Sequence, residues 1–233
     1  GGALCHADPS ATATSNMMGT IGLNLIPTAR MDNAGTLRTT LSRTGPYTHS
    51  VLGLQINDRL FLALRQTADS PSLGSDANAL YPGVDAKLRL FHEKKFRPEI
   101  SVGLQSALGR NRLAGQYLAL SKRSGNLDVT GGFGWGRFGT RQKLINPVLF
   151  HNTSNTHWFQ GPMGVFGGLQ YNITQNLALK ADWTSDSWKE ETHQRASPLS
   201  FGASFQPLSW LDTGIAWNTG NGVMARISIT PSL

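Results

Sequence analysis

The chain has 233 residues and a formal net charge of +7, and its 15 % of charged residues lies below the roughly 25 % typical of soluble domains. This length suits one all-β domain, and no linker, low-complexity run or block of like charge divides the sequence. No apolar stretch approaches the roughly 20 residues of a membrane-spanning helix, which excludes a helical membrane protein. The positive charge implies attraction to anions. The basic residues are dispersed and form no nucleic-acid motif, so nucleic acid is not an expected partner.

Residues 1–35 precede the first strand pattern and form a separate predicted segment. The single Cys5 allows no intrachain disulfide. Its surroundings fit either a signal-peptide remnant cut after Ala7, which we favour, or a lipidated cysteine. Residues 17–31 are apolar but interrupted by Pro27 and by glycines. We expect this stretch either to plug the lumen of a barrel or to form a periplasmic tail against its rim.

Patterns of alternating apolar and polar residues follow one another along residues 36–233 and predict about twelve antiparallel strands. The expected strands are 36–42, 51–56, 60–67, 84–91, 99–105, 114–123, 127–136, 164–171, 177–184, 198–206, 211–217 and 222–230.

The connectors between these strands are alternately short and long. Tight turns such as 57–58 and 124–126 lie on one side, and the long loops 68–83, 137–163 and 185–197 lie on the other. Bacterial outer-membrane barrels have short periplasmic turns and longer outer loops. The pattern therefore predicts an up-and-down transmembrane β-barrel with both termini in the periplasm and the long loops as outer contact surfaces.

The two faces of each strand indicate what each face contacts. In residues 177–184, Leu, Leu, Ala and Trp alternate with Ala, Lys and Asp, and residues 223–230 divide in the same way. A soluble β-sandwich also alternates, with its apolar face in a core. Strands of about eight to ten residues favour the membrane barrel, because globular strands average about five or six.

Several charged side chains fall on the predicted lumenal face. The basic residues are Arg38, Arg65, Lys87, Arg89, Lys180 and Arg226, with Asp85, Asp128 and Asp182 as partners. In one interpretation these charges form salt bridges that fill a small barrel. In the other they line a solute path or bind an acidic polysaccharide. Both remain open from the sequence.

Six tryptophans provide candidates for the aromatic girdles of a membrane barrel, many of them near predicted strand ends. They are Trp135, Trp158, Trp183, Trp188, Trp210 and Trp217. Ordinary core packing is an equal alternative for each of them.

No motif predicts catalysis, a cofactor or a metal site. Gly134, Gly136 and Gly139 match a dinucleotide-binding spacing, but no amphipathic helix follows to hold a pyrophosphate, so the glycines are better explained by strand bending or close packing. Residues 151–155 contain the His, Ser and Asn of an outer-membrane phospholipase in the wrong spacing and in a loop. The six histidines form no pair at the spacing of zinc ligands.

One family resemblance extends over nearly the whole chain. Residues 22–31, GLNLIPTARM, followed by Gly-Thr-Leu at 35–37 and Ser-Arg at 42–43, resemble the opening of the YjbH/GfcD family of outer-membrane exopolysaccharide and capsule proteins. Further similar blocks follow in the same order at 83–90, 102–105, 117–123, 134–139, 166–171, 182–188 and 210–212. Family members are usually longer, so the chain resembles a short member or a first barrel.

The resemblance implies a non-enzymatic outer-membrane barrel in secretion or assembly of exopolysaccharide or capsule. It brings no catalytic residues with it. The implied partners are outer-membrane lipid and lipopolysaccharide, an acidic polysaccharide and other polysaccharide-export proteins. The alternatives are a small-solute porin and an outer-membrane lipid acyl hydrolase.

Overall fold

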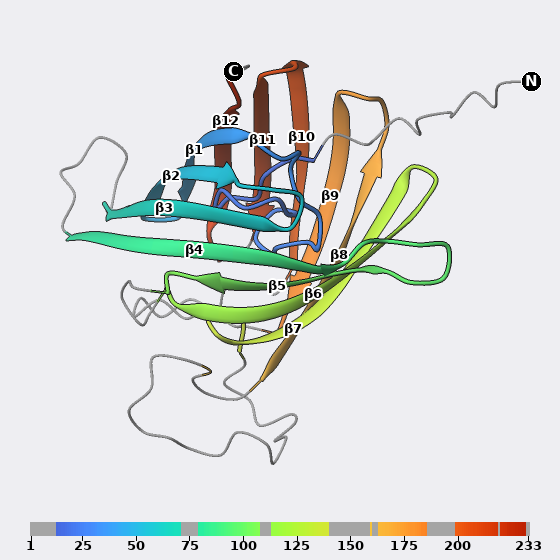
Figure 1. Cartoon of the computed structure of the whole chain (residues 1–233). Helices are drawn as coiled ribbons and strands as arrows, with labels where there is room; N and C mark the ends of the chain where they lie inside the picture. Colours follow the sequence, from blue (N-terminus) through green and yellow to red (C-terminus); the bar gives the residue numbers. More distant parts are fainter. Residues whose placement is uncertain are drawn as a thin grey trace, which may run out of the picture.

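Antiparallel strands close into one barrel in the computed structural model of the chain (Figure 1). The structure describes residues 13–70, 79–107, 113–139, 159, 163–185, 199–218 and 220–231. Within these ranges the strands are β1 (Leu37–Thr44), β2 (Tyr47–Gln55), β3 (Leu60–Asp69), β4 (Ala79–Phe91), β5 (Glu99–Gln105), β6 (Gly115–Ser124), β7 (Leu127–Gly136), β8 (Gly164–Asn172), β9 (Leu177–Thr184), β10 (Leu199–Leu208), β11 (Leu211–Asn218) and β12 (Gly222–Ile229). This confirms the predicted antiparallel up-and-down barrel of about twelve strands.

The barrel is closed by pairing of its first and last strands. β1 and β12 run antiparallel, from Thr39 opposite Ile229 to Arg43 opposite Ala225, and every other strand pairs with its neighbours in sequence. Closure gives each strand a partner on both sides, which a bilayer requires because it offers no water to unpaired backbone groups. No helix among the described residues is long and apolar enough to cross a membrane.

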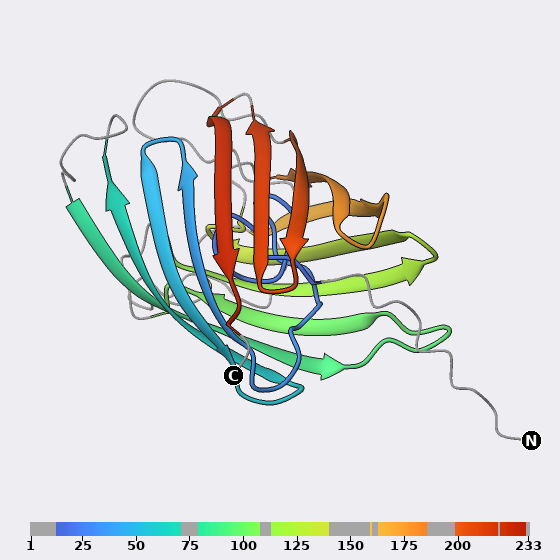
Figure 2. The same cartoon turned by 90° about the horizontal axis from the view of Figure 1, so that it is seen from above.

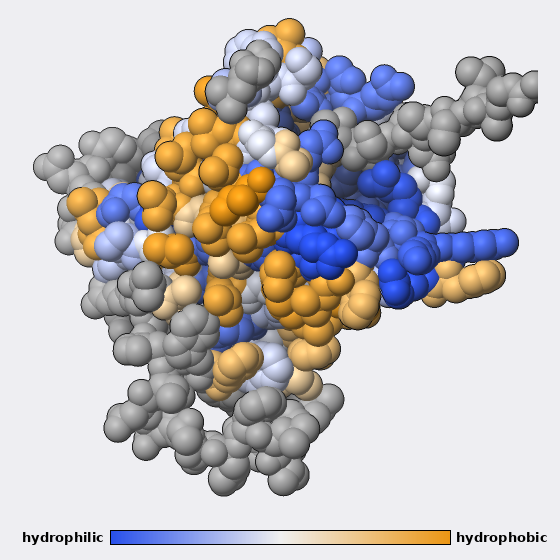
Figure 3. Space-filling model, in the orientation of Figure 1, coloured by the Kyte–Doolittle hydropathy of each residue, from blue (hydrophilic) through white to orange (hydrophobic). Residues whose placement is uncertain are grey.

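The wall is apolar outside and polar inside. Leu64 on β3 is 62 % exposed, whereas its neighbour Arg65 is 3 % exposed and points into the lumen. The same division recurs around the wall, and Figure 3 shows apolar residues gathered on its outer surface. A soluble sandwich would bury its apolar side chains and expose its polar ones. The observed arrangement is the reverse, as expected of a wall that faces lipid.

Two strands, β2 and β4, start more than two residues away from their predicted positions. β1 and β2 continue through the expected connector 43–50 to a two-residue turn, in which Gly45 adopts a positive φ of 57° next to Pro46. The strand ends were missed because Thr, Arg, His and Ser there give no apolar alternation. β4 begins at Ala79, five residues before the predicted start, and includes Pro82. Pro82 is tolerated because β4 extends past β5 at this position and pairs only with β3.

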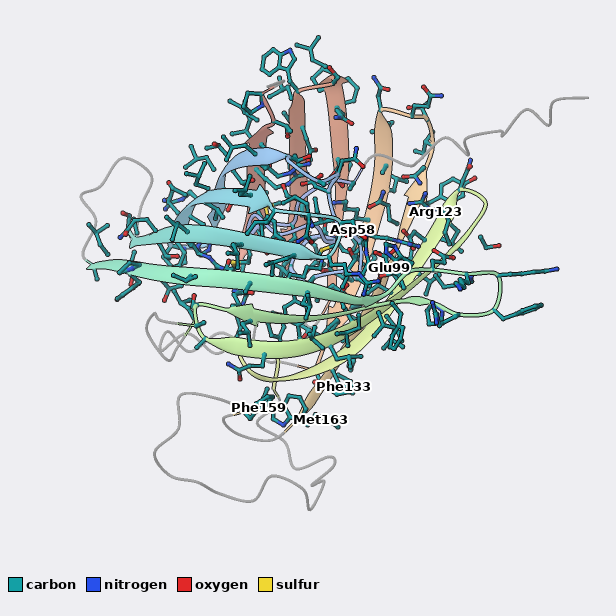
Figure 4. All side chains as sticks on the ribbon, viewed as in Figure 1. Asp58, Glu99, Arg123, Phe133, Phe159 and Met163 are labelled. Atoms are coloured by element: carbon teal, nitrogen blue, oxygen red, sulfur yellow. The ribbon has the colours of Figure 1, made fainter. Side chains whose placement is uncertain are left out.

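The connectors divide the barrel into two poles. One pole, the short-turn pole, holds the turns at 56–59, 92–98, 125–126, 173–176 and 209–210 as well as the start of β1 and the end of β12. The opposite, long-loop pole holds the connectors β3–β4, β5–β6, β7–β8 and β9–β10, together with the short turns β1–β2 and β11–β12. In Figure 4, Asp58, Glu99 and Arg123 lie toward the first pole, and Phe159 and Met163 lie at the second.

Much of the predicted loops 68–83, 137–163 and 185–197 lies outside the described residues, as do Cys5 and the 151–155 motif. Trp158 and Trp188 also lie there. The other four predicted girdle tryptophans are placed near strand ends. Trp183, Trp210 and Trp217 are 40 %, 44 % and 50 % exposed, and Trp135 packs edge to face against Phe133 and Phe159.

We expect the substitution Leu64→Arg to destabilise the folded barrel in lipid bilayers by about 2–4 kcal/mol, because a charge near the bilayer midplane loses its hydration. Leu64→Phe is the matched control and should leave the unfolding free energy nearly unchanged. The measurement is urea unfolding in vesicles, with folding checked by the mobility difference between unboiled and boiled samples on a gel. Equal stability of the two variants would contradict a lipid-facing position for this residue.

Candidate functional site: a plugged lumen and its polar mouth

A segment ahead of β1, residues 13–31, fills the barrel lumen and is called the plug below. Figure 2 shows this blue segment inside the ring of strands. Its apolar side chains are buried, including Met18 and Ala29 at 0 % exposure. Arg38, at the start of β1, donates hydrogen bonds to the carbonyl of Ala13 at 3.4 Å and to the carboxylate of Asp32 at 2.8 Å. Both ends of the plug therefore lie at the short-turn pole.

The plug folds on itself in tight turns rather than in a strand or a helix. Asn16 organises the first turn, because its side-chain oxygen accepts hydrogen bonds from the backbone N–H groups of Met18 at 2.9 Å and Thr20 at 3.2 Å. Gly19 has a positive φ of 78° and lies so close to Val51 of β2 that an added Cβ would come within 2.7 Å of it. A side chain at this position would be both strained and obstructed.

Two lysines of the wall bind backbone carbonyl oxygens of the plug. The Lys180 ammonium on β9 donates to the carbonyls of Gly22 at 2.8 Å, Ser15 at 3.3 Å and Leu23 at 3.4 Å. The Lys87 ammonium on β4 donates to the carbonyls of residues 21 and 30 at 3.2 Å and 2.5 Å. Both lysines are about 97–98 % buried. Their charges therefore serve to satisfy acceptors that water does not reach.

Carboxylates of the wall bind backbone N–H groups of the plug in the complementary way. Asp182 on β9 accepts hydrogen bonds from the N–H groups of Leu25 at 2.7 Å and Ile26 at 3.0 Å, and from the Asn24 side chain at 3.0 Å. Asp212 on β11 accepts one from the Ser15 N–H at 3.3 Å. Leaving a buried N–H without an acceptor costs about 1–3 kcal/mol. These carboxylates therefore stabilise the plug in its position inside the lumen.

Apolar side chains of the plug fit three small clusters of inward-facing residues on the wall. The members are Leu23, Ile26 and Ala29 with Tyr117, Ala119, Phe138 and Phe166; Met17 with Ala216 and Met224; and Met31 with Val51, Phe61 and Ala63. Gly168 on β8 makes room for the plug, since an added Cβ would come within 2.4 Å of the Leu23 side chain. The fit is therefore specific in shape as well as in polarity.

Two buried ion pairs within the wall also contact the plug. Arg226 contacts Asp212 at 2.5 Å and the hydroxyl of Ser15 at 2.8 Å. Arg65 pairs with Asp85 and also reaches the sulfur of Met18 at 3.5 Å. Removing one partner of a buried ion pair leaves the other charge buried and uncompensated, which is strongly destabilising. Each residue of these pairs therefore requires its partner.

At the short-turn pole the lumen opens into a cavity of about 320 Å³, called the mouth below. Arg30 of the plug crosses it and binds three carboxylates, Glu93 at 2.7 Å, Glu99 at 2.8 Å and Asp128 at 2.9 Å. Arg89 also contacts Glu99, at 2.7 Å. Arginine, carboxylate, amide and hydroxyl groups thus line a water-accessible surface that is closed below by the plug.

The six basic residues predicted from the sequence all point inward, but they divide into two groups. Arg38 and Arg89 line the mouth. The other four lie deeper, bonded to the plug or to acidic partners as described above: Arg65, Lys87, Lys180 and Arg226. Binding of a ligand by any of the six stays a prediction.

Sequence reasoning missed several residues that hold the plug in place. Arg30 lies in a segment without periodicity, so nothing in the sequence indicates that it faces three carboxylates. Glu99 and Asp212 could have been found, because each occupies the inward phase of an alternating strand. Of the predicted acidic partners, Asp85 pairs with a wall arginine, whereas Asp128 and Asp182 bind the plug.

Two of the three glycines with dinucleotide-like spacing have a packing role. Gly134 and Gly136 belong to β7. A Cβ added to Gly134 would lie 2.4 Å from the backbone oxygen of Gln116 in β6, and one added to Gly136 would lie 2.4 Å from that of Ala114 in the β5–β6 connector. Within the residues that the structure describes, no group of three or more His, Cys, Asp or Glu side chains is placed to hold a metal ion.

Comparison with known proteins identifies the family. A family model described as exopolysaccharide biosynthesis protein YbjH matches residues 14–233. The chain belongs to the YjbH family. It is 26 % identical over 237 aligned residues to the uncharacterized lipoprotein YjbH of Escherichia coli strain K12, and the alignment covers 91 % of this chain. The chain spans about a third, 34 %, of the length of that relative.

A solved porin structure shows the same fold. The KdgM porin superposes with a TM-score of 0.51 at 9 % sequence identity, covering 85 % of this chain and 99 % of the porin. An outer-membrane channel from Pseudomonas putida F1 gives a TM-score of 0.48 at 12 % identity, covering 87 % and 98 % of the two chains. The YjbH-family chain is an outer-membrane β-barrel, as predicted.

Replacing Asp182 by alanine should loosen the plug, because the N–H groups of Leu25 and Ile26 lose their acceptor at a cost of about 1–3 kcal/mol each. Hydrogen exchange followed by mass spectrometry should report faster exchange of plug amides in Asp182→Ala than in the wild type. Asp182→Asn keeps one carbonyl oxygen and should lie between the two. Unchanged protection in Asp182→Ala would show that the carboxylate does not hold the plug.

Glu93, in the turn between β4 and β5, provides a pH-dependent contact to the plug. Burial raises its pKa, but hydrogen bonds from Lys122, from the Arg123 backbone and from Arg30 outweigh burial and lower the pKa from 4.5 to about 2. The carboxylate therefore stabilises the folded state above pH 4.5, and this contribution is lost as the pH falls from 4.5 toward about 2.

We therefore expect Glu93→Gln to be less stable than the wild type at pH 7 and the two proteins to converge near pH 2. Comparing urea midpoints of both proteins across this range isolates the contribution of this carboxylate from that of the other acids. A difference between the two proteins that is constant from pH 7 to pH 2 would exclude the ionised Glu93 as its source.

Proposed function

We propose that this barrel is an accessory, non-enzymatic component of exopolysaccharide or capsule assembly in the outer membrane, and that it does not itself conduct the polymer. The observation that carries the proposal is the plug, which occupies the lumen and is bonded to opposite walls through Lys87, Lys180 and Asp182. Family membership supports the process, since the family is described as exopolysaccharide biosynthesis proteins.

The size of the barrel supports an accessory role. Barrels of about eight strands have interiors that side chains fill, and open aqueous channels are typical of 16 to 18 strands. This wall has an intermediate twelve strands and in addition encloses residues 13–31. A polymer would have to displace a segment many of whose backbone polar groups are hydrogen-bonded, at a cost of about 1–3 kcal/mol for each group left unpaired.

The orientation in the membrane is part of the proposal. Outer-membrane barrels carry short turns on the periplasmic side and longer loops outside. We therefore assign the short-turn pole, with the mouth and both ends of the plug, to the periplasm. The relative from Escherichia coli is named a lipoprotein and is about three times as long. Because the start of β1 and the end of β12 both lie at the short-turn pole, segments joined to either end of such a barrel would begin on the periplasmic side.

The mouth is the surface on which an acidic polysaccharide would bind. Arg38 and Arg89 line it together with Arg30 and Arg123, and guanidinium groups bind carboxylates and phosphates through paired hydrogen bonds. The carboxylates of the mouth compete for the same donors. Binding there would therefore be weak and sensitive to salt.

Crosslinking the plug to the wall distinguishes an accessory component from a conduit. Met17 of the plug and Met224 of β12 belong to one packed cluster, so Met17→Cys combined with Met224→Cys allows the plug to be crosslinked to the wall. In a strain that lacks the gene, we expect the crosslinked protein to restore surface polysaccharide as well as the two single substitutions, Met17→Cys and Met224→Cys, do. Loss of polysaccharide only after crosslinking would contradict the proposal and favour a conduit.

Conductance in planar bilayers tests the same proposal without cells. We expect the wild type to remain closed and the variant lacking residues 13–31 to conduct. A second variant, Asp182→Ala, covers the case in which the deletion does not fold, and it should show transient openings. Steady conductance of the wild type would instead support a small-solute porin.

A further inference from the structure

The turn between β4 and β5, residues 92–98, carries an exposed combination of aromatic and basic side chains. It projects beyond the neighbouring turns at the right of Figure 1. Phe96 at its tip is 90 % exposed, the most exposed of the large apolar side chains among the described residues. An exposed Phe of this kind is not explained by packing within the barrel.

Three cations of the turn have no acidic partner among the described residues. Lys94, Lys95 and Arg97 form no ion pair within the part of the chain that the structure describes. The nearby Glu93 is already bound by Arg30 and Lys122. The Arg97 guanidinium donates to a backbone carbonyl at 3.3 Å, and its Nε is buried without a hydrogen-bond partner among the described residues. The turn therefore presents uncompensated positive charge.

The cations of the turn lie against its aromatic rings at the lipid-facing edge of the wall. The Lys95 ammonium is 5.3 Å from the centre of the Phe96 ring, and the Arg97 guanidinium is 4.9 Å from that of Phe91. Phe91 lies opposite Ile100 at the end of β4 and is 47 % exposed. It continues the apolar outer surface of the barrel, so Arg97 lies where this surface ends.

We propose that the β4–β5 turn binds the phosphate headgroup of an anionic phospholipid in the periplasmic leaflet, with Phe96 inserted among the acyl chains. Guanidinium and ammonium groups bind phosphate, and aromatic side chains prefer the membrane interface. The site is continuous with the lipid-facing wall, which favours a lipid over a protein partner. The proposal uses the periplasmic orientation assigned above, but it does not depend on the role of the plug.

Lipid binding to the purified full chain is measured by native mass spectrometry with phosphatidylglycerol and with phosphatidylcholine. The wild type should prefer phosphatidylglycerol. Arg97→Gln should weaken phosphatidylglycerol binding about fivefold, and the triple variant K94Q/K95Q/R97Q about tenfold or more. Arg59, an exposed cation in the neighbouring turn, provides the matched control, and Arg59→Gln should change binding less than about twofold. Equal binding of the two lipids, or equal loss in both single variants, would overturn the proposal.

Crosslinking in intact cells tests the occupant directly. Phe96 is replaced by the photoreactive p-benzoylphenylalanine, and the wild-type wall position Leu64 receives the same label as a lipid-facing control. We expect phospholipid adducts at both positions. A protein adduct at position 96 would identify a partner surface instead, and a lipopolysaccharide adduct there would place the turn in the outer leaflet; either result would overturn the proposal. Neither result would bear on whether the plug closes the lumen.

Discussion

The structure depends on one constraint, the satisfaction of the plug's backbone polar groups inside a barrel that excludes water. Lys180 and Lys87 bind its carbonyl oxygens, and Asp182 binds its N–H groups. The dependence is mutual, because the same hydrogen bonds satisfy charged groups of the wall that would otherwise be buried alone. Wall and plug therefore stabilise each other.

This mutual dependence bears on what the protein does. Charged side chains in the lumen of a membrane barrel are usually considered as a path for solutes, and here most of them are occupied by the chain itself. At the mouth of the short-turn pole, arginines line a water-accessible cavity. Among the described residues, the parts of the barrel that are free to meet other molecules are thus the mouth, the short turns and the lipid-facing rim, which supports the assembly role proposed above.

Much of the fold was predictable because a barrel wall obeys a period of two residues. Where inward residues are polar and outward ones are apolar, as in β9 and β12, the strand, its faces and its pairing follow directly. Prediction was wrong at the start of β2 and of β4, where Thr, His, Pro and Gly interrupt the alternation. At these positions pairing with an adjacent strand determines the structure.

The sequence by itself determined the closed antiparallel wall, the direction of its charged side chains and the pole that carries the long loops. These properties are local and repeat along each strand. Only the tertiary structure decided that residues 13–31 fill the lumen and which charges they occupy. Contacts such as Ser15 with Lys180 join residues 165 positions apart, and Arg30 meets Asp128 from a segment without any period. No local pattern encodes such contacts, because they depend on the shape of the space that the closed wall encloses.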